Sequence, residues 1–508
     1  MIATGSSTVP AAGRGTLAAA LAGAVLLGVL GWLLAPAPSS PGPEQSGDPA
    51  LAERLRAAAG PGQYGVVAAV VEGGAVTYAG IGDDGRGTPV SATTPFEIGS
   101  VTKTMTGAVL AGLERQGVVD ADDRVREVVP GREWGPVGDV TLGELVSHRS
   151  GLPRLASGFD RFAMGLGYTW FGTDPYDSSP EEVFASADAA GLGPRGEPEY
   201  SNLANALLGQ VLAARTGTPY PQLVEQIVTG PLGMTATAIP DAAPPGAAVG
   251  HDEAGRAVAP WISPGDVPGG VGVWSTAEDL VRYAGALDAP GSPVADAAVP
   301  RYPSDFGRIG YGWYILETGG HTLLWKNGGS GGVSSSVLAE PATGSTVVVL
   351  GNSEAGVDRI GAELLGVPPP STARTDDAGG VELPGLVPVL VAIVFPLSAG
   401  TTVLGAARGG WRRAPASVRR TDVGTALGTG LFFLVVAWAT GAIGWAYVPF
   451  WVAGCVLAGA GAGLAVARWR DWGPDHDAGA GGRRASAAFG LVLGLGALAA
   501  VVTARVLI

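Results

Sequence analysis

The sequence predicts an α/β body of the α+β type, built on an antiparallel sheet flanked by helices and extended by a helical subdomain. A transmembrane helix precedes this body, and a bundle of about four transmembrane helices follows it. Three observations support this architecture. Residues 50–365 have the alternation of apolar and polar side chains that is typical of globular domains. Within them, β-rich runs lie at both ends and helical patterns lie between. Both ends of the chain are almost continuously apolar.

The first apolar segment, Leu17–Ala35, is about 19 residues long, which suffices to cross a bilayer as a helix. A cleaved signal peptide is the alternative, because Ala35-Pro36-Ala37 loosely resembles a small-x-small cleavage site. We favour a signal anchor over residues 1–35. Residues 36–49, rich in Pro, Gly and Ser, are then expected to be a linker.

Two hairpins are expected at the ends of the body. Tyr64–Val71 and Ala75–Ala79 surround a Gly-Gly turn, and Ser334–Glu340 and Ser345–Leu350 surround a Pro-Ala-Thr-Gly turn. Two helical patterns lie between the hairpins, Val101–Gln116 and Asn202–Arg215. This order favours a sheet whose terminal strands meet, with a helical layer inserted between them.

A second linker is expected over residues 366–384, and residues 385–508 are expected to form the membrane domain. Four spans are predicted there: Gly385–Ala407, Val423–Thr440, Val448–Ala467 and Ala485–Ala504. The loops Arg408–Arg420 and Arg468–Arg484 hold nine Arg together, so the positive-inside rule places both in the cytoplasm. The body would then lie on the outer face of the cell membrane.

Charge and composition exclude other classes of function. Residues 385–508 carry ten Arg against four acids, whereas the rest of the chain has a balance of −20. An acidic body without a basic stripe argues against nucleic-acid binding. The four His are scattered and the single Cys455 lies in an apolar run, so no metal-ligand spacing or disulfide framework is present. We expect no cofactor and no metal.

The most informative feature is the scarcity of lysine. Of 31 basic residues, only Lys103 and Lys326 are lysines. Arginine stays protonated, whereas a lysine in a dry or electropositive pocket can lose its proton and act as a base. Lys103 lies three residues after Ser100 at the start of a helical pattern, so the amine can reach the hydroxyl and activate it as a nucleophile. A helix cap beside a solvated lysine is the alternative for Ser-x-x-Lys alone.

Two further motifs have the residue types that acyl transfer needs. Tyr200-Ser201-Asn202 precedes a helix, and beside two cations a phenol can ionise and shuttle protons. Lys326-Asn327-Gly328-Gly329 follows an apolar run, and its glycines allow a substrate backbone to lie close. Taken singly, the first motif also fits a packed aromatic with a helix cap, and the second also fits a loop.

Together, Ser-x-x-Lys, Tyr-x-Asn and Lys-x-Gly at 100, 200 and 326 resemble the penicillin-recognising serine hydrolases, which include class C β-lactamases, DD-peptidases and esterases. Three more runs are similar to that superfamily: Leu145–Pro153, Pro231–Met234 and Gly270–Leu280. The resemblance covers about residues 50–355. It implies a β-lactamase/transpeptidase-like fold, and it assigns these residues: Ser100 as nucleophile, Lys103 and Tyr200 as shared base, and Asn202, Lys326, Asn327, Gly328 and Gly329 in substrate binding.

The resemblance also implies an oxyanion hole formed by the backbone N–H groups of Ser100 and Gly329. One departure is Asn327, since the superfamily usually has Thr there, whose hydroxyl often contacts a substrate carboxylate. We therefore expect weak β-lactam hydrolysis and better turnover of small esters or D-amino-acid derivatives, and we expect Asn327→Thr to raise penicillin acylation. His148, in Leu145–Pro153, is interpreted as structural.

The sequence thus favours a membrane-bound extracytoplasmic serine hydrolase that forms an acyl-serine intermediate on peptide, amide or ester substrates. Cell-wall D-alanyl peptides are the nearby candidates, and the lipid bilayer is the other expected partner. A penicillin sensor with slow deacylation is the alternative from another class, although inner loops of about 15 residues leave little room for an effector domain. A third possibility is a scaffold protein with a vestigial pocket.

Overall fold

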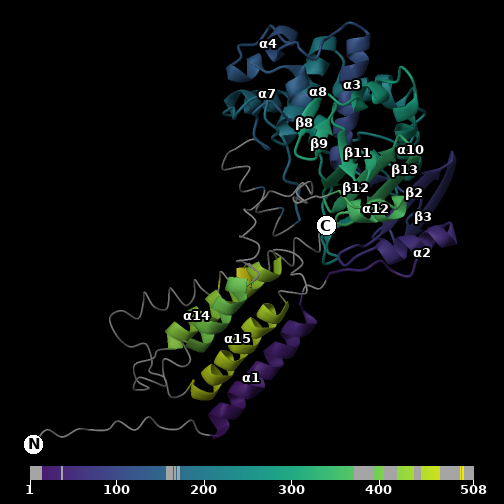
Figure 1. Ribbon diagram of the computed structural model, residues 1–508. Helices are drawn as coiled ribbons and strands as arrows, with labels where there is room; N and C mark the ends of the chain where they lie inside the picture. Colours follow the sequence, from purple (N-terminus) through teal and green to yellow (C-terminus); the bar gives the residue numbers. More distant parts are fainter. Residues whose placement is uncertain are drawn as a thin grey trace, which may run out of the picture. The chain divides into compact units, whose positions relative to one another are not determined.

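The computed structural model describes residues 14–35, 38–155, 164, 168, 172–370, 393–405, 420–439, 448–469, 492 and 495–496. The chain divides into two compact units. One, called here the body, consists of residues 39–168 and 172–381. The other, called here the apolar unit, consists of the two ends of the chain together with residues 169–171 (Figure 1).

A nine-stranded sheet forms the centre of the body, in the order β1-β3-β2-β13-β12-β11-β10-β9-β8. Every neighbouring pair is antiparallel. The strands are β1 (Gln45–Gly47), β2 (Val66–Glu72), β3 (Ala75–Ile81), β8 (Tyr302–Ser304), β9 (Gly307–Ile309), β10 (Tyr314–Thr318), β11 (His321–Ser330), β12 (Val333–Glu340) and β13 (Ser345–Gly351). Short pairs also form between β4 (Phe96–Glu97) and β7 (Trp274–Ser275), and between β5 (Gly250–His251) and β6 (Ala257–Val258).

Both predicted hairpins are present, and they meet in the middle of the sheet. Strand β2 pairs with β13 along its length, with Val348 opposite Ala69. The expectation that the terminal strands of the body lie side by side is therefore confirmed. Most residues of β2, β12 and β13 are buried, so the pairing places β-branched side chains on both faces of a covered sheet.

The two faces of the sheet have different covers. Helices α2 (Pro49–Ala58) and α12 (Asp358–Leu365) pack on one face, against alternate residues of β2 and β13 such as Ala68 and Val349. The opposite face, with Val67 and Val348, packs against the inserted helical layer. That layer contains α3 (Thr102–Arg115), α4 (Val125–Val128), α5 (Leu142–Val146), α7 (Pro180–Ala189), α8 (Asn202–Thr216), α9 (Tyr220–Val224), α10 (Ala277–Gly285) and α11 (Pro293–Ala298). In Figure 1, α4, α7 and α8 lie at the end of the body away from α2.

The segment predicted as a linker over residues 36–49 is corrected by the structure. The backbone N–H of Ser39 donates to Glu253 O at 2.7 Å, and β1 pairs with β3, with Ser46 opposite Gly80. Polar composition does not prevent a segment from completing the edge of a sheet, because the bonds use main-chain groups. Residues 39–49 therefore belong to the body.

The second linker was predicted over residues 366–384. Within it, Val367 is buried against the body, and residues 371–384 lie outside the described residues.

Within its described residues, the apolar unit has three helices long and apolar enough to cross a membrane, in α1 (Arg14–Leu33), α14 (Arg420–Ala439) and α15 (Val448–Arg468). They correspond to the predicted anchor and to two of the four predicted C-terminal spans. The span predicted at 385–407 corresponds to a shorter apolar helix, Ile393–Gly405. Nearly all of the span predicted at 485–504 lies outside the described residues.

Candidate active site

Ser100 lies at the junction between the small strand β4 and helix α3. It occupies a 3₁₀ turn, Gly99–Val101, that leads directly into α3. Gly99 has φ of +52°, and a Cβ there would lie 2.6 Å from Gly329 N. Only glycine fits this turn, because a side chain would be strained and would also meet the backbone of β11. The turn therefore places Ser100 directly before the first residue of α3.

Lys103 reaches Ser100 as the spacing predicts. Lys103 Nζ donates hydrogen bonds to Ser100 Oγ at 2.7 Å and to Gly269 O at 2.5 Å. Lys103 is 0% exposed and Ser100 is 5% exposed. The alternative of a solvated lysine beside a helix cap is therefore wrong for this pair. A buried amine held between a hydroxyl and a carbonyl has the position required of a general base.

Tyr200 completes the contacts of the nucleophile. Its phenol O–H donates to Ser100 Oγ at 2.7 Å. Lys103 Nζ lies 4.9 Å and Lys326 Nζ lies 5.1 Å from the centroid of its ring, and the Arg154 guanidinium carbon lies at 5.4 Å. Positive charge on several sides stabilises negative charge that develops on the phenol during proton transfer. The sequence pointed to two of these cations, but not to Arg154.

Strand β11 sends its motif residues to opposite faces. Lys326 is 0% exposed and faces Tyr200. The Asn327 amide instead donates to Asp358 Oδ2 at 2.9 Å, beside the bond from Trp325 Nε1 to Asp358 Oδ1 at 2.8 Å. Asp358 begins α12, on the other face of the sheet. Alternation along a strand places residues 325 and 327 together and 326 opposite. The structure therefore does not bring the Asn327 side-chain amide to Ser100, where the predicted substrate contact would need it.

The two glycines of the motif bring β11 against the nucleophile. A Cβ on Gly328 would lie 2.3 Å from Ile98 O and 2.7 Å from Ser100 N. Gly329 lies against Gly99 in the same way. The two glycines therefore allow the backbone of β11 to lie close to the backbone at Ser100. Glycine within a strand often marks such a close approach of two backbones.

Asn202 is the first residue of α8, after the N-cap Ser201. Its amide Nδ2 lies 3.5 Å from Tyr176 Oη, whereas its Oδ1 is buried with no hydrogen-bond partner among the described residues. A buried amide oxygen without a partner is costly in a folded protein. An amide oxygen in this position can accept a hydrogen bond from an N–H donor.

Glu97 is a residue of the site that the sequence analysis did not identify. It is buried three residues before Ser100 and accepts hydrogen bonds from Gly272 N at 3.0 Å, from Trp261 N at 3.4 Å and from the hydroxyl of Ser330. Burial raises the pKa of its carboxyl to about 8. The sequence did contain a signal for Glu97, because it is an acidic residue between the apolar Phe96 and Ile98. A charged side chain in a buried strand needs hydrogen-bond partners.

Comparison with known proteins agrees with this geometry. A family model described as Beta-lactamase matches residues 52–365. The D-alanyl-D-alanine-carboxypeptidase/endopeptidase AmpH of Escherichia coli is 30% identical over 231 residues, which are 44% of this chain and 57% of the relative. Esterase EstB of Burkholderia gladioli is 30% identical over 278 residues, 46% of this chain and 69% of the relative. The chain thus matches little more than half the length of AmpH.

Solved structures share the fold. The octameric penicillin-binding protein homologue from Pyrococcus abyssi aligns with a TM-score of 0.52 and 25% identity, covering 62% of this chain and 76% of that one. A β-lactamase/D-alanine carboxypeptidase from Yersinia pestis aligns with a TM-score of 0.50 and 21% identity, covering 62% and 96%. Because the family match covers more than half of the chain and lies within the body, the resemblance seen in the motifs is confirmed: this chain belongs to the Beta-lactamase family.

Proposed function

We propose that the body hydrolyses peptide, amide or ester substrates through an acyl-enzyme on Ser100. The observation that carries this proposal is the convergence of two proton-transferring groups on one hydroxyl. Lys103 Nζ and Tyr200 Oη each lie 2.7 Å from Ser100 Oγ. A serine hydroxyl is a weak nucleophile until a neighbouring base takes its proton. Contacts of this length are within the range that proton transfer requires.

The reaction begins with attack of Ser100 Oγ on the substrate carbonyl carbon. The hydroxyl proton passes to Lys103 or Tyr200, whichever is deprotonated, and a tetrahedral oxyanion forms. We propose the backbone N–H groups of Ser100 and Gly329 as its hydrogen-bond donors, since β11 packs against the Gly99 turn. The same pair of groups then returns a proton to the leaving amine or alcohol. In the second half, the base takes a proton from water, and the hydroxide that forms attacks the acyl carbon. The bond from this carbon to Ser100 Oγ breaks, and Oγ takes the proton back from the base as the acid product leaves.

The remaining site residues bind the substrate in this proposal. The unpartnered Oδ1 of Asn202 accepts an amide N–H of the substrate. Lys326 supplies positive potential from within the protein. Asn327 takes no part, because its amide is engaged with Asp358. The name of AmpH indicates a D-alanyl peptide, and that of EstB indicates an ester, so D-alanyl peptides of the cell wall and small esters are the substrates to try first.

Labelling of membranes with a fluorophosphonate and with fluorescent penicillin tests the proposal. We expect the fluorophosphonate to label wild type stably and fluorescent penicillin to label it only transiently, and we expect Ser100→Ala to abolish both labels. Ser334→Ala is the matched control, because Ser334 is buried in β12 and donates to Ala355 O at 2.8 Å. Penicillin label that persists after the free probe is removed would instead indicate the penicillin sensor. Complete absence of label on wild type would overturn the proposal.

We further propose that the chain is held in the cell membrane with the body on the outer face. The three long apolar helices and the Arg-rich segments at 408–420 and 468–484 support this topology. A topology reporter fused after Gly380 should be active only outside the membrane, and one placed between Arg412 and Arg420 only inside. The opposite activities would overturn the placement of the body and any role in the cell wall.

The packing of α1 supports an anchor that is retained rather than cleaved. A Cβ on Gly23 would lie 2.2 Å from Gly459 O, and one on Gly463 would lie 2.1 Å from Ala19 O. Such backbone approach between helices is the use of small residues in membrane packing. Trp451 Nε1 also donates to Gly31 O at 2.8 Å. An N-terminal tag should therefore remain with the full-length chain in membranes, and loss of the tag would contradict retention.

A further inference from the structure

His148 stands in a backbone conformation that rarely accommodates a side chain. It is the only non-glycine residue with a positive φ, +57°, among the residues that the structure describes. It directly follows Ser147, the C-cap of α5. The Arg149 N–H donates to Glu144 O at 2.9 Å, which closes the turn that ends this helix. Helices that end in this way usually place glycine at the left-handed position, so a histidine here needs another reason.

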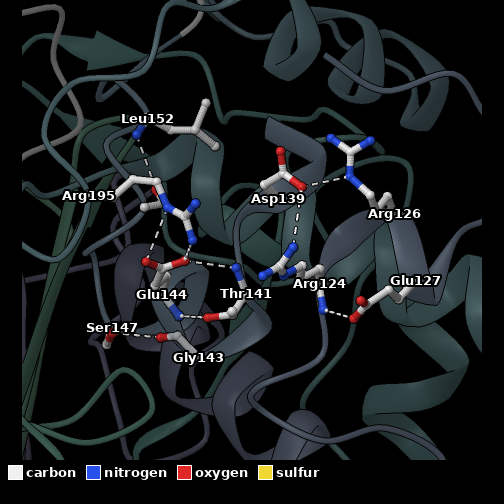
Figure 2. Close-up of polar contacts among 11 residues, drawn as sticks. Arg124, Arg126, Glu127, Asp139, Thr141, Gly143, Glu144, Ser147, Leu152 and Arg195 are labelled. Atoms are coloured by element: carbon white, nitrogen blue, oxygen red, sulfur yellow. Dashed lines mark hydrogen bonds and ion pairs between the residues drawn. The ribbon is translucent and has the colours of Figure 1, made fainter. Parts of the chain in front are cut away.

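The helix before His148 is fixed on several sides, as Figure 2 shows. The Thr141 N–H donates to Glu144 Oε2 at 2.9 Å, and the Glu144 N–H donates to Thr141 Oγ1 at 3.2 Å. Arg195 pairs with the Glu144 carboxylate at 2.5 Å. At the other end, Ser147 Oγ donates to Gly143 O at 2.6 Å. These contacts hold the strained residue in one place, which is the condition under which such strain persists.

His148 contacts Tyr200 and both of its neighbours in the chain. The Glu199 N–H donates to His148 O at 2.8 Å, and the Ser201 N–H donates to His148 Nδ1 at 3.2 Å. Between these two bonds, the imidazole lies against the Tyr200 ring, with 4.3 Å between centroids and 38° between planes. One residue therefore fixes the backbone on either side of Tyr200 and supports the ring that carries the phenol.

The imidazole has the protonation state that this contact requires. Burial first, and then the charges of Lys103, Lys326 and Arg154, hold the pKa of His148 well below its ordinary value of 6.5. The neutral ring keeps Nδ1 free of hydrogen, so it can accept from Ser201. The proton then resides on Nε2, which has no hydrogen-bond partner among the described residues. The orphaned N–H and the positive φ are both unfavourable to folding, and a structural glycine would carry neither.

We propose that His148 is the positioning residue for Tyr200: it aims the phenol at Ser100 by holding residues 199–201 and by packing its ring on the phenol ring. This inference rests on the proposed function, because it acts through the Tyr200–Ser100 contact. It also gives a role to the Leu145–Pro153 run, whose Arg149 O accepts from Gly196 N at 2.8 Å. That run forms the frame against which the Tyr200 segment is placed.

The first test compares His148→Ala with His251→Ala in the full-length chain. His251 is a matched control: it is 4% exposed against 3% for His148, and it stacks on Tyr64 with 3.8 Å between centroids. We expect His148→Ala to lower kcat for ester hydrolysis and the rate of fluorophosphonate labelling by about 10²-fold, at the lower end of the effect of general-base catalysis. KM should change little. His251→Ala should keep both rates near those of wild type.

Two further variants separate positioning from folding. Asn tolerates a positive φ, and its Oδ1 occupies the place of Nδ1, so His148→Asn should restore the Ser201 bond and recover activity to within about tenfold of wild type. His148→Gly removes the backbone strain and the side chain together. It should unfold at no lower temperature than His148→Ala while losing as much activity.

A double-mutant cycle with Tyr200→Phe is the decisive measurement. If His148 acts through Tyr200, His148→Ala should cost almost nothing further in the Tyr200→Phe background. Full additivity of the two losses would overturn the proposal, as would equal losses in His148→Ala and His251→Ala, or a loss carried by KM. Failure of wild type to label at Ser100 would instead overturn the proposed function itself.

Discussion

Lys326 and Asn327 are neighbours on β11, yet the sheet sends their side chains into two different environments. Lys326 is buried over the Tyr200 ring on the face that carries Ser100. Asn327 donates to Asp358 on the face covered by α12, where Ser336 Oγ also donates to Asp358 at 2.6 Å. The difference teaches that alternation along a strand divides a motif between two faces. The face of β11 that carries Lys326 and lies towards Ser100 is called here the chemical face, and the face that carries Asn327 and lies towards Asp358 is called the structural face.

The largest effect is expected from Lys103, the centre of the chemical face. Lys103→Arg retains the charge, but a guanidinium does not accept the Ser100 proton at any accessible pH. We expect Ser100 acylation to fall by about 10³-fold or more, the loss that removal of a general base produces. Stopped-flow measurement of fluorophosphonate labelling checks this. Acylation near the wild-type rate would mean that Tyr200 alone takes the proton.

Lys326→Arg should have a smaller effect on the same face. Lys326 lies about 5 Å from the Tyr200 and Tyr314 rings, at 5.1 and 5.2 Å from their centroids, and it supplies potential rather than proton transfer. Arginine keeps the charge but is bulkier in a fully buried position, so we expect a loss of about tenfold in kcat/KM. Measuring kcat/KM for Lys103→Arg and Lys326→Arg in the same assay shows which lysine contributes more to the reaction. A loss equal to that of Lys103→Arg would place Lys326 in proton transfer as well.

The sequence predicted the contact between Lys103 and Ser100, but not the contact between Asn327 and Asp358. Ser100 and Lys103 are close in sequence on one helix start, so their contact follows from helical spacing alone. The meeting of β2 and β13 follows from two hairpins at the ends of the body. The face on which Asn327 lies depends instead on the register of β11 and on Asp358, 31 residues farther along the chain. The positive φ of His148 was also missed, because the turn that ends α5 has no glycine at this position to indicate it.

Asn327→Thr tests the structural face directly. Threonine at position 327 would still point towards Asp358, so we expect penicillin acylation to stay within about twofold of wild type rather than to rise. Loss of the amide bond to Asp358 should lower the free energy of unfolding by about 1–2 kcal/mol. Denaturant unfolding of the full-length chain in detergent, followed by tryptophan fluorescence, measures this. Ser336→Ala is the matched control, since it removes another bond to the same carboxylate.

A tenfold gain in penicillin acylation by Asn327→Thr would contradict the division of β11. It would mean that residue 327 can turn to the side of Ser100 despite its place beside Trp325. An unchanged free energy of unfolding in both Asn327→Thr and Ser336→Ala would contradict the second half of the comparison, namely that the Asp358 contacts stabilise the sheet.

The smallest effect concerns Glu97, which is buried three residues before Ser100 and accepts hydrogen bonds from Gly272, Trp261 and Ser330. Burial raises the pKa of its carboxyl from 4.5 to about 8. Between these values the folded chain keeps a proton that the unfolded chain releases. Stability should therefore fall as pH rises towards 8, by at most about 1.4 kcal/mol per pH unit. Glu97→Gln should flatten this slope.

The comparison of wild type with Glu97→Gln from pH 6.5 to 8 gives the Glu97 contribution, because Glu114 and Glu253, whose pKa values burial also raises, are present in both chains. Asp174, whose pKa burial raises to about 6, contributes in the same direction but only below that pH. His148 and His251, whose pKa values burial lowers, act in the opposite direction and only below 6.5. Asp174→Asn should therefore change the slope below pH 6 alone, whereas Glu97→Gln should change it up to 8. Equal slopes for wild type and Glu97→Gln above pH 6.5 would show that Glu97 is ionised in the folded chain, held by its three hydrogen-bond donors rather than by a proton.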